Sequence, residues 1–342
     1  MAVAGRLLDP LARGLRVQPN ALAPNNLWAI TGRGFIRSAV ARERPDVVVA
    51  TTPPPSAMVA AASTVGATPL VVELRDLWAG NPHFDRNGPL LRRLEGRVLA
   101  RADAVVTVTE GCRETLLRLH PEITDRLHVL PNGFEPALLD RREPPSDSEP
   151  ATLIHAGSLY GDRTAENLIA ALAQPELRGR VRLELLGVID GRTRRALAAS
   201  GGVDAETVGS IAWDDAIARV VAARIAVVIN AQTTGGDIAL PNKLFEALAL
   251  GRPVLALTSP RSETARLLER LGQDSGLAPL DDPVAITAAI ERLLASPPAP
   301  VPAEALAEFD RDRIAERYAA LLDEVATRSS NATSSGTTTS RR

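Results

Sequence analysis

The segment LPNKLFEALALG, at residues 240–251, combines residue types that can hold an anion and a pair of hydroxyls. Pro241 suits the first position of a helix and Gly251 suits the position just after its end, so a short helix is expected between them. The first turn of such a helix attracts anions, and the ammonium of Lys243 adds a full charge there. Glu246 shares that face and can accept hydrogen bonds from vicinal hydroxyls. This combination suits a nucleotide, although an ordinary exposed Lys/Glu pair explains the spacing equally well.

Lys243 is also the only lysine in the chain. The other 38 of the 39 Lys and Arg residues are arginine. A composition that favours arginine so strongly suggests that a compact ammonium is needed at this position, since a guanidinium is larger and planar. Chance can also leave a single lysine anywhere, so the count supports an anion site without establishing it.

A second candidate is the segment LIHAGSLYGDR at residues 153–163, where a strand is expected to enter a glycine-containing loop and then a helix. Gly157 would let the backbone approach a phosphate, and Arg163 can bind a phosphate through two hydrogen bonds. The segment lacks the G-x-G-x-x-G and Walker spacings, so the fingerprints of dinucleotide binding and ATP hydrolysis are absent. A tight turn between strand and helix needs glycine in any case, which is the simpler explanation.

A third candidate is the segment ELRDLW at residues 73–78, at the end of an expected strand. Its carboxylate, guanidinium and aromatic ring can serve as a base, an anion clamp and a stacking platform. The alternative is an ion pair between Arg75 and Asp76 above a packed Trp78.

From residue 151 onward, short apolar runs alternate with helical stretches. Such runs are typical of buried parallel strands, and six strand–helix units in about 145 residues indicate a doubly wound Rossmann-type domain. Strands are expected at 152–156, 181–186, 207–211, 225–230, 253–257 and 276–280. Helices are expected at 164–173, 192–200, 214–223, 241–250, 261–271 and 283–295.

The first half repeats this pattern with fewer units. Strands are expected at 46–50, 69–74, 104–109 and 127–130. Helices are expected at 34–44, 56–65, 89–101 and 111–119. No strand is expected in residues 1–30, so either the first sheet is smaller or the chain starts downstream of its natural start. We favour the second interpretation.

The domain boundaries follow from composition. LPNGFE at residues 130–135 is a turn signature, because Asn132–Gly133 tolerates positive φ and allows a chain reversal just before the linker. The Ser/Thr-rich end of the chain predicts disorder. The expected parts are an N-terminal domain at 1–134, a proline-rich linker at 135–150, a second domain at 151–302, a helix at 303–326 and a disordered tail at 327–342.

Composition also excludes several classes of protein. The net charge of -2 gives the protein no overall positive potential that would attract nucleic acid. Cys112 is the only cysteine and the four histidines never pair at metal-ligand spacing, so we expect no disulfide, metal site or cofactor. The chain lacks a serine-hydrolase G-x-S-x-G motif. No apolar run approaches the roughly 18 residues of a membrane span, and there is no signal-peptide core, which favours the cytoplasm.

Taken together, these segments resemble the family 4 (group 1) glycosyltransferases of the GT-B fold. Most similar is the bacterial subgroup that builds cell-envelope or exported polysaccharides. The resemblance runs from about Pro45 to Ala326 and rests on PDVVVATTPPP, VVELRDLWAG, ADAVVTVTEGCRETL, VLPNGFE, LIHAGSLYG and LPNKLFEALALGRPVLAL, in that order. The ordered set is more specific than any one of these strings.

The resemblance implies an α/β protein with two Rossmann-like, doubly wound domains facing across a cleft, the N-terminal one lacking its first strands. The second domain would bind a nucleoside-diphosphate sugar, and the final helix would cross back to the first domain. Lys243 and Arg163 would hold the diphosphate, and Asp76 would lie on the acceptor side. The residues implied in substrate binding are Gly157, Ser158, Ser210, Ile211, Gly236, Asp237, Asn242, Leu244 and Glu246.

The implied reaction moves a sugar to the hydroxyl of a sugar, lipid-linked or small-molecule acceptor, with retention at the anomeric carbon and without a metal. A lipid-linked acceptor would bring the protein to the inner face of the membrane. Arg6, Arg13 and Arg16, among leucines, could form a basic patch for that contact, although an unstructured start explains them more simply.

Two departures from the family pattern keep alternatives open. The first strand of the family and its glycine-rich loop have no counterpart in residues 1–45, and the E-x7-E pattern is incomplete. The E-x7-E pattern needs a glutamate eight residues before Glu246, but that position is Ile238, with Asp237 beside it. Contacts with the donor sugar are therefore open. The alternatives are a catalytically inactive homologue that binds nucleotide-sugars and another GT-B enzyme such as a sugar-nucleotide epimerase.

Overall fold

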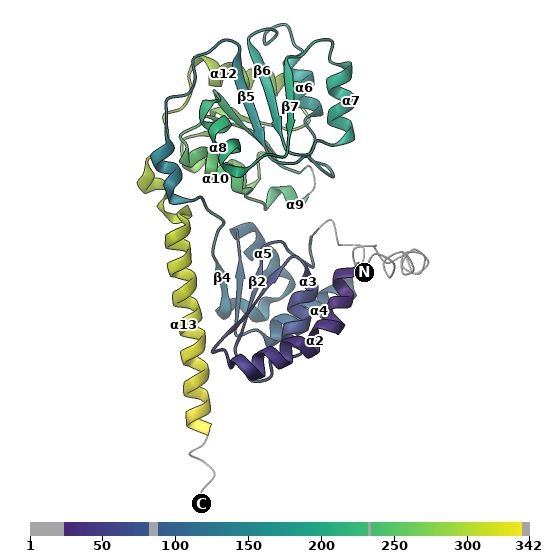
Figure 1. Ribbon diagram of the computed structural model, residues 1–342, viewed down its shortest axis with the longest axis vertical. Helices are drawn as coiled ribbons and strands as arrows, with labels where there is room; N and C mark the ends of the chain where they lie inside the picture. Colours follow the sequence, from purple (N-terminus) through teal and green to yellow (C-terminus); the bar gives the residue numbers. More distant parts are fainter. Residues whose placement is uncertain (1–23, 82–87, 232–233, 337–342) are drawn as a thin grey trace, which may run out of the picture. The chain divides into compact units, whose positions relative to one another are not determined.

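The chain divides into two compact units, each an α/β unit built around its own parallel sheet (Figure 1). The first unit comprises Met1–Pro131 and Ala315–Arg342, and the second comprises Asn132–Ile314. The computed structural model describes residues 24–81, 88–231 and 234–336.

The sheet of the first unit has the strand order β1-β2-β3-β4. Val71 of the second strand pairs with Val49 on one side and Ala104 on the other, so the apolar runs of neighbouring strands lie side by side. Each strand begins and ends within two residues of its predicted bounds. The strands are β1 (Val48–Thr52), β2 (Leu70–Leu74), β3 (Ala104–Thr107) and β4 (Leu127–Val129).

Helices pack against this sheet and fix the ends of its strands. The hydroxyl of Thr109 accepts a hydrogen bond from the N–H of Cys112 at 3.1 Å and so caps the helix that follows β3. Leu321 and Val325, near the end of the chain, pack against Val71. The helical elements of this unit are α2 (Pro24–Glu43), α3 (Pro55–Ala62), α4 (Gly88–Arg101), α5 (Glu110–Leu119), η3 (Pro121–Arg126) and α13 (Arg311–Gly336), which enters from the second unit.

The first helix, α2, begins at Pro24, earlier than the predicted start at residue 34. Gly32 and Gly34 weaken the helical pattern because glycine is a poor helix former, but packing of α2 along α3 outweighs this preference. The basic segment containing Arg6, Arg13 and Arg16 lies outside the described residues.

The helix predicted at 303–326 is two elements. A 3-10 helix, η6 (Ala303–Phe309), ends before Asp310, whose carboxylate accepts hydrogen bonds from the N–H groups of Asp312 at 2.8 Å and Arg313 at 3.4 Å. This capping starts α13 anew. α13 then continues beyond Ala326 to Gly336, through residues predicted to be disordered. Ser, Thr and Asn cost a formed helix little per residue, and no glycine or proline interrupts α13 before Gly336.

The second unit has a six-stranded parallel sheet with the order β10-β9-β8-β5-β6-β7. Counted within this unit, the order is that of a Rossmann-type sheet, as the alternating pattern predicts. The chain order reverses between the neighbouring strands β5 and β8, and ligands bind at such a switch point in open α/β sheets. The strands are β5 (Ala151–Ala156), β6 (Val181–Leu186), β7 (Ala205–Gly209), β8 (Ile225–Ile229), β9 (Val254–Leu257) and β10 (Leu277–Ala278).

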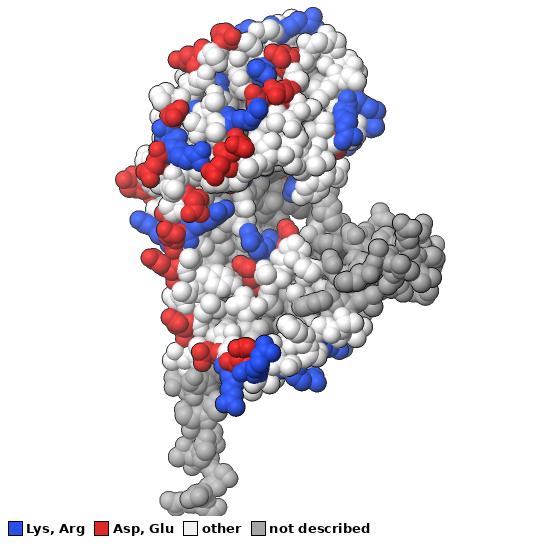
Figure 2. Space-filling model, in the orientation of Figure 1, with Lys and Arg blue, Asp and Glu red and all other residues white. Residues whose placement is uncertain are grey.

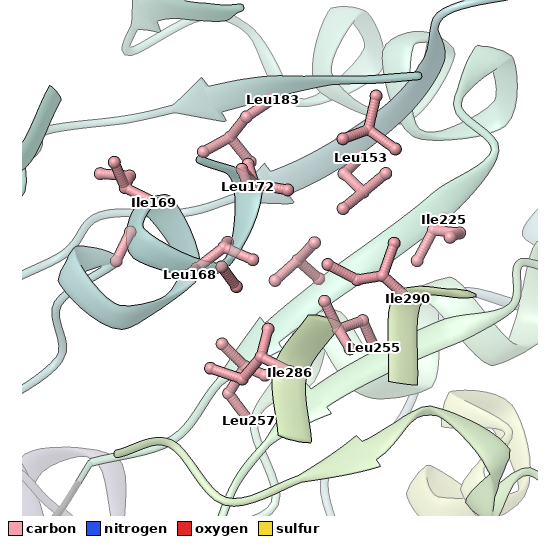
Figure 3. Packing of buried hydrophobic residues seen from close by; sticks show 14 of the residues in the cluster. Leu153, Leu168, Ile169, Leu172, Leu183, Ile225, Leu255, Leu257, Ile286 and Ile290 are labelled. Atoms are coloured by element: carbon pink, nitrogen blue, oxygen red, sulfur yellow. The ribbon is translucent and has the colours of Figure 1, made fainter. Parts of the chain in front are cut away.

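Apolar helix faces cover both sides of this sheet. Leu168 and Ile290 belong to the cluster on one side, whose buried helical residues come from two helices and which is shown in part in Figure 3. Ile217 and Phe245 belong to the cluster on the other side. The helices are α6 (Glu166–Leu172), α7 (Gly191–Ala199), α8 (Trp213–Ala222), α9 (Thr234–Asp237), α10 (Asn242–Ala249), α11 (Glu263–Arg270) and α12 (Pro283–Ala295).

The turn predicted at LPNGFE has a different role. Gly133 does not adopt positive φ. Instead, a Cβ added at Gly133 would collide with the carbonyl oxygen of Phe309. The N–H of Phe134 donates to that carbonyl at 3.0 Å, and the carbonyl of Phe134 accepts from Arg311 at 3.2 Å. Glycine is therefore needed for close approach of two chain segments, which the local sequence does not reveal.

The linker, predicted as aperiodic, contains a 3-10 helix, η4 (Pro136–Arg141), and is anchored by a buried arginine. Arg252 is 1% exposed, and its guanidinium donates to the carbonyls of Glu143 and Val221, the latter at 2.9 Å. A third carbonyl, from Ala223, accepts at 3.3 Å. Arg252 therefore connects the linker to the end of α8.

Replacing Arg252 with methionine should lower the free energy of unfolding by about 2–4 kcal/mol, because buried carbonyls lose their donors. Urea unfolding followed by circular dichroism measures the change. Arg266→Met is the matched control, since the side chain of Arg266 is 54% exposed and its contacts, with the carbonyl of Arg261 and with Glu263, lie at the surface. A loss below about 1 kcal/mol for Arg252→Met would contradict the anchoring role.

The visible face of the second unit mixes acidic and basic side chains, as expected for a near-neutral chain (Figure 2). Within the described ranges, no helix has the length and apolar character needed to cross a membrane.

Candidate functional site

A cavity of about 330 Å³ lies at the switch point of the second sheet. Its walls come from β5, β8, α8 and α10 and from the loops that follow β5, β6 and β7. Residues far apart in sequence meet here because the carboxyl ends of parallel strands share one edge of a sheet. The predicted site residues that line it are Gly157, Ser158, Ser210, Ile211, Lys243 and Glu246.

Lys243 lies in the first turn of α10. Pro241, predicted as the first residue of this helix, is instead its N-cap, so the helix begins one residue later, at Asn242. At the other end, Gly251 has φ +69 and follows the C-cap, as predicted. The Nζ atom of Lys243 lies 3.1 Å from Nε2 of His155. Burial, followed by the charge of Arg163, lowers the pKa of Lys243 to about 8, while Glu246 opposes this shift.

The loop after β5 passes very close to this ammonium. Gly157 has φ +142, a conformation that favours glycine, and a Cβ added there would lie 2.5 Å from Nζ of Lys243. The hydroxyl of Ser158 accepts a hydrogen bond from the N–H of Val188 at 3.2 Å and ties the loop to the end of β6. Glycine therefore suits this position because of its backbone conformation, and a larger residue would also displace the ammonium of Lys243.

Arg163 does not line the cavity. Its Nη1 donates to the Tyr160 hydroxyl at 2.7 Å, and its guanidinium lies 5.0 Å from the centroid of the Tyr160 ring. Its charge nevertheless lowers the pKa values of both Lys243 and His155. Arg163 is therefore an electrostatic neighbour of the site, and its contact with a phosphate stays a prediction.

Glu246 lies one turn beyond Lys243 on α10 and accepts a hydrogen bond from the indole N–H of Trp213 at 3.2 Å. Trp213, the first residue of α8, is 46% exposed and also lines the cavity. The indole orients one carboxylate oxygen and leaves the other without a contact from Trp213. The cavity thus offers a cation and an oriented acceptor to one ligand.

Four other predicted residues of the second unit, Gly236, Asp237, Asn242 and Leu244, do not line the cavity. Leu244 is fully buried in an apolar cluster, and its N–H donates to the carbonyl of Pro241 at 3.0 Å. Helical spacing turns the side chain of Leu244 toward the sheet, and a substrate contact of this residue stays a prediction. Asn242 is exposed and Asp237 is half-buried at the end of α9.

Gly236 has a structural role. A Cβ added to it would collide with the carbonyl oxygen of Ala231, and its own carbonyl accepts a hydrogen bond from Asn230 at 3.3 Å. Asn230 also donates to the Thr264 hydroxyl at 2.9 Å. This buried network holds α9 at the end of β8.

Asp76 belongs to the first unit, in the loop after β2, and is exposed. Trp78 is 8% exposed, so it packs in the interior and is not available as a stacking platform. The simpler interpretation of Trp78 is therefore confirmed. A role for Asp76 in catalysis stays a prediction.

Sequence reasoning missed one residue beside the cavity, His155, and did not give Trp213 its contact with Glu246. His155 is 1% exposed, and its apolar strand context gave no sign that it contacts Lys243. The family resemblance implies only that the loop around Ser210–Trp213 meets the base of the nucleotide, without a role for the indole N–H. Among the described residues, no group of three or more His, Cys, Asp or Glu side chains could hold a metal ion.

Two family models match the chain. The model described as a glycosyl transferase 4-like domain matches residues 4–133, and the model described as glycosyl transferases group 1 matches residues 150–296. No curated protein matches the sequence.

Solved structures with the same fold include HepE from Anabaena in complex with UDP. It is 18% identical, with a TM-score of 0.67, over 85% of this chain and 82% of that chain. A glycosyltransferase from Rickettsia africae is 14% identical, with a TM-score of 0.61, over 89% of this chain and 83% of that chain. A putative UDP-N-acetylglucosamine 2-epimerase from Listeria monocytogenes is 16% identical, with a TM-score of 0.51, over 80% of this chain and 74% of that chain.

The two models match successive parts of the chain, and the solved structures share its fold. The chain therefore belongs to the glycosyltransferases of the GT-B fold, with a glycosyl transferase 4-like domain followed by a group 1 domain.

Proposed function

We propose that the cavity of the second unit binds the nucleoside diphosphate of a sugar donor, and that the protein transfers the sugar to a hydroxyl acceptor. The observation that carries this proposal is that Lys243 and Glu246 line one cavity at the switch point of the sheet. The ammonium suits a diphosphate, and the carboxylate suits the two hydroxyls of a ribose. The UDP complex of HepE supports a nucleotide ligand for this fold.

In the transfer, the bond between the anomeric carbon and the β-phosphate oxygen breaks, and its electron pair stays on that oxygen. The acceptor oxygen forms the new bond to the anomeric carbon, and its proton passes to the departing diphosphate. Negative charge therefore builds on the diphosphate, and Lys243 and the N–H groups at the start of α10 would stabilise it. Arg163 does not line the cavity, but its positive charge lies near Lys243 and would add to this stabilisation.

The acceptor side rests on the family resemblance. Asp76 would act near the acceptor hydroxyl, and the segment 235–237 would face the donor sugar. Retention at the anomeric carbon, a role in polysaccharide or glycoconjugate synthesis for the cell envelope, and contact with the inner membrane through a lipid-linked acceptor stay predictions.

An inactive homologue that binds nucleotide-sugars is the second candidate. It is favoured by Ile238, which stands where the family pattern has a glutamate. Such a protein would bind the same nucleotides and yield no product, so binding and turnover must be measured separately.

The test begins with thermal shifts in the presence of UDP, GDP, ADP and dTDP. A ligand that binds the folded state at a hundred times its Kd stabilises it by about 2.7 kcal/mol, so the matching nucleotide should raise the Tm by several degrees. The corresponding nucleotide-sugar is then assayed for hydrolysis and transfer. Binding without turnover would support the inactive homologue, and absence of binding to all four nucleotides would refute the donor site.

The affinity for the matching nucleotide should fall as pH rises through about 8, the pKa of Lys243. Below this pH Lys243 is an ammonium and attracts the diphosphate; above it the neutral amine does not. If only the ammonium form binds, Kd should rise by about tenfold from pH 7 to pH 9. Calorimetric titration at both pH values measures this. Lys243→Arg should bind with little pH dependence in this range, because a guanidinium stays charged.

A further inference from the structure

We propose that His155 is the positioning residue for Lys243: a neutral imidazole that aims the ammonium into the cavity without cancelling its charge. This inference rests on the proposed function, because it assigns the ammonium to the diphosphate. It starts from a polar side chain that is almost completely buried beside the site, 1% exposed, at the end of β5.

The place of His155 in the fold explains why its side chain is needed. The pairing of β5 with β8 joins Leu153 to Ile225 and Ile154 to Ala226. Beyond this pairing, Nδ1 of His155 contacts the carbonyl oxygen of Val227 at 3.0 Å. The imidazole therefore bridges the two strands at the switch point, and its other nitrogen faces α10.

The two contacts of the ring determine where its hydrogen lies. A carbonyl oxygen only accepts, so Nδ1 of His155 carries the hydrogen and donates it to Val227. Nε2 of a neutral ring then has a free lone pair, which accepts a hydrogen bond from Nζ of Lys243 at 3.1 Å. A protonated ring would direct a second N–H at the ammonium. Burial, with the charges of Lys243 and Arg163, holds the pKa of His155 well below its usual range, so the ring is neutral.

A neutral acceptor has a specific advantage at an anion site. A carboxylate in this position would orient Lys243 equally well, but it would neutralise the ammonium with an ion pair. The charged groups that act on Lys243 are Arg163, a cation, and Glu246, which also accepts a hydrogen bond from Trp213. His155 therefore leaves the positive charge available to the ligand, while Gly157 leaves room for Nζ.

The single lysine allows a direct test on the full chain without a chemical tag. Protein grown with lysine labelled with 13C at Cε gives one signal, whose shift with pH reports the titration of Lys243. In His155→Leu the ammonium loses its acceptor, so its titration midpoint should fall by about one pH unit or more. His155→Gln, whose amide oxygen can accept the hydrogen bond, should retain most of the native midpoint. His128→Leu, at a half-buried histidine of β4 in the first unit, is the control.

Ligand binding separates positioning from a purely structural role. In His155→Leu, the affinities for UDP and for inorganic pyrophosphate should fall by about tenfold, whereas the affinity for uridine, which has no phosphate, should not change. His155→Gln should restore binding of both phosphate ligands. Equal losses for UDP and uridine would indicate a structural role and overturn the inference.

The two proposals fail in distinguishable ways. If the wild-type protein binds neither pyrophosphate nor any of the four nucleoside diphosphates, the proposed function is overturned. The positioning role of His155 is then overturned as well. If the wild type binds UDP and the midpoint of Lys243 is the same in His155→Leu, this inference alone is overturned. Should His155→Leu not fold, His155→Gln and His155→Asn give the same comparison, because the shorter asparagine mimics the Nδ1 side of the ring and leaves Lys243 without its acceptor.

Discussion

Lys243→Ala should lower kcat for sugar transfer by at least about 10²–10³-fold, the range seen when one preorganised donor to a developing negative charge is removed. The physical reason is the place of the ammonium: Nζ lies in a cavity at the start of α10, held by His155 and accommodated by Gly157. Water that enters in place of the side chain must reorganise as the diphosphate departs, whereas a fixed ammonium is already oriented. Steady-state kinetics with the matching nucleotide-sugar measures the loss.

The control for Lys243→Ala must remove the same charge elsewhere. Arg195→Ala suits this purpose, because Arg195 is exposed on α7 and does not line the cavity. Its kcat should remain within about twofold of the wild type, since exposed charges away from a site act weakly through solvent. Lys243→Arg should recover part of the rate, limited by the size of the guanidinium next to Gly157. A loss in Lys243→Ala no larger than in Arg195→Ala would refute the assignment.

The elements that form the site were predictable because short-range patterns determine them. Six apolar runs alternating with helical stretches indicated the second sheet, and its observed strand order places a switch point between β5 and β8. Gly251 marked the end of α10 correctly, since the residue after the C-cap has a left-handed backbone conformation there, which glycine adopts most easily. Helical spacing also placed Lys243 and Glu246 on one face, and both line the cavity.

The residues that the sequence did not reveal depend on contacts between distant segments. His155 resembles any other buried strand residue until the fold brings Lys243, far along the chain, to 3.1 Å. Leu244 lies between Lys243 and Glu246 in the sequence, yet its side chain belongs to the core. Gly133 carried a strong turn signal, but its small size serves contact with Phe309. Motifs therefore identify segments, whereas the orientation of each side chain depends on packing.

Glu246→Ala should weaken binding of UDP, or of whichever nucleoside diphosphate shifts the Tm, by about a hundredfold. The carboxylate would accept hydrogen bonds from both ribose hydroxyls, and each hydrogen bond to a charged group contributes about 1.5–3 kcal/mol. Water in the space left by the side chain replaces part of this, so the loss is smaller than the sum. Glu291→Ala on α12, whose side chain is 44% exposed, removes the same charge away from the cavity and should leave Kd unchanged.

The ribose assignment predicts more than a loss of affinity. The wild-type protein should bind the ribonucleotide about tenfold more tightly than its 2′-deoxy analogue, because the analogue leaves one hydrogen bond to Glu246 unmade. In Glu246→Ala this preference should disappear, since the acceptor is absent for both ligands. Trp213→Phe, which keeps the ring and removes the N–H that orients the carboxylate, should reduce the preference without abolishing it. A preference that persists in Glu246→Ala would place the ribose elsewhere, because coupling between a hydroxyl and a carboxylate requires their contact.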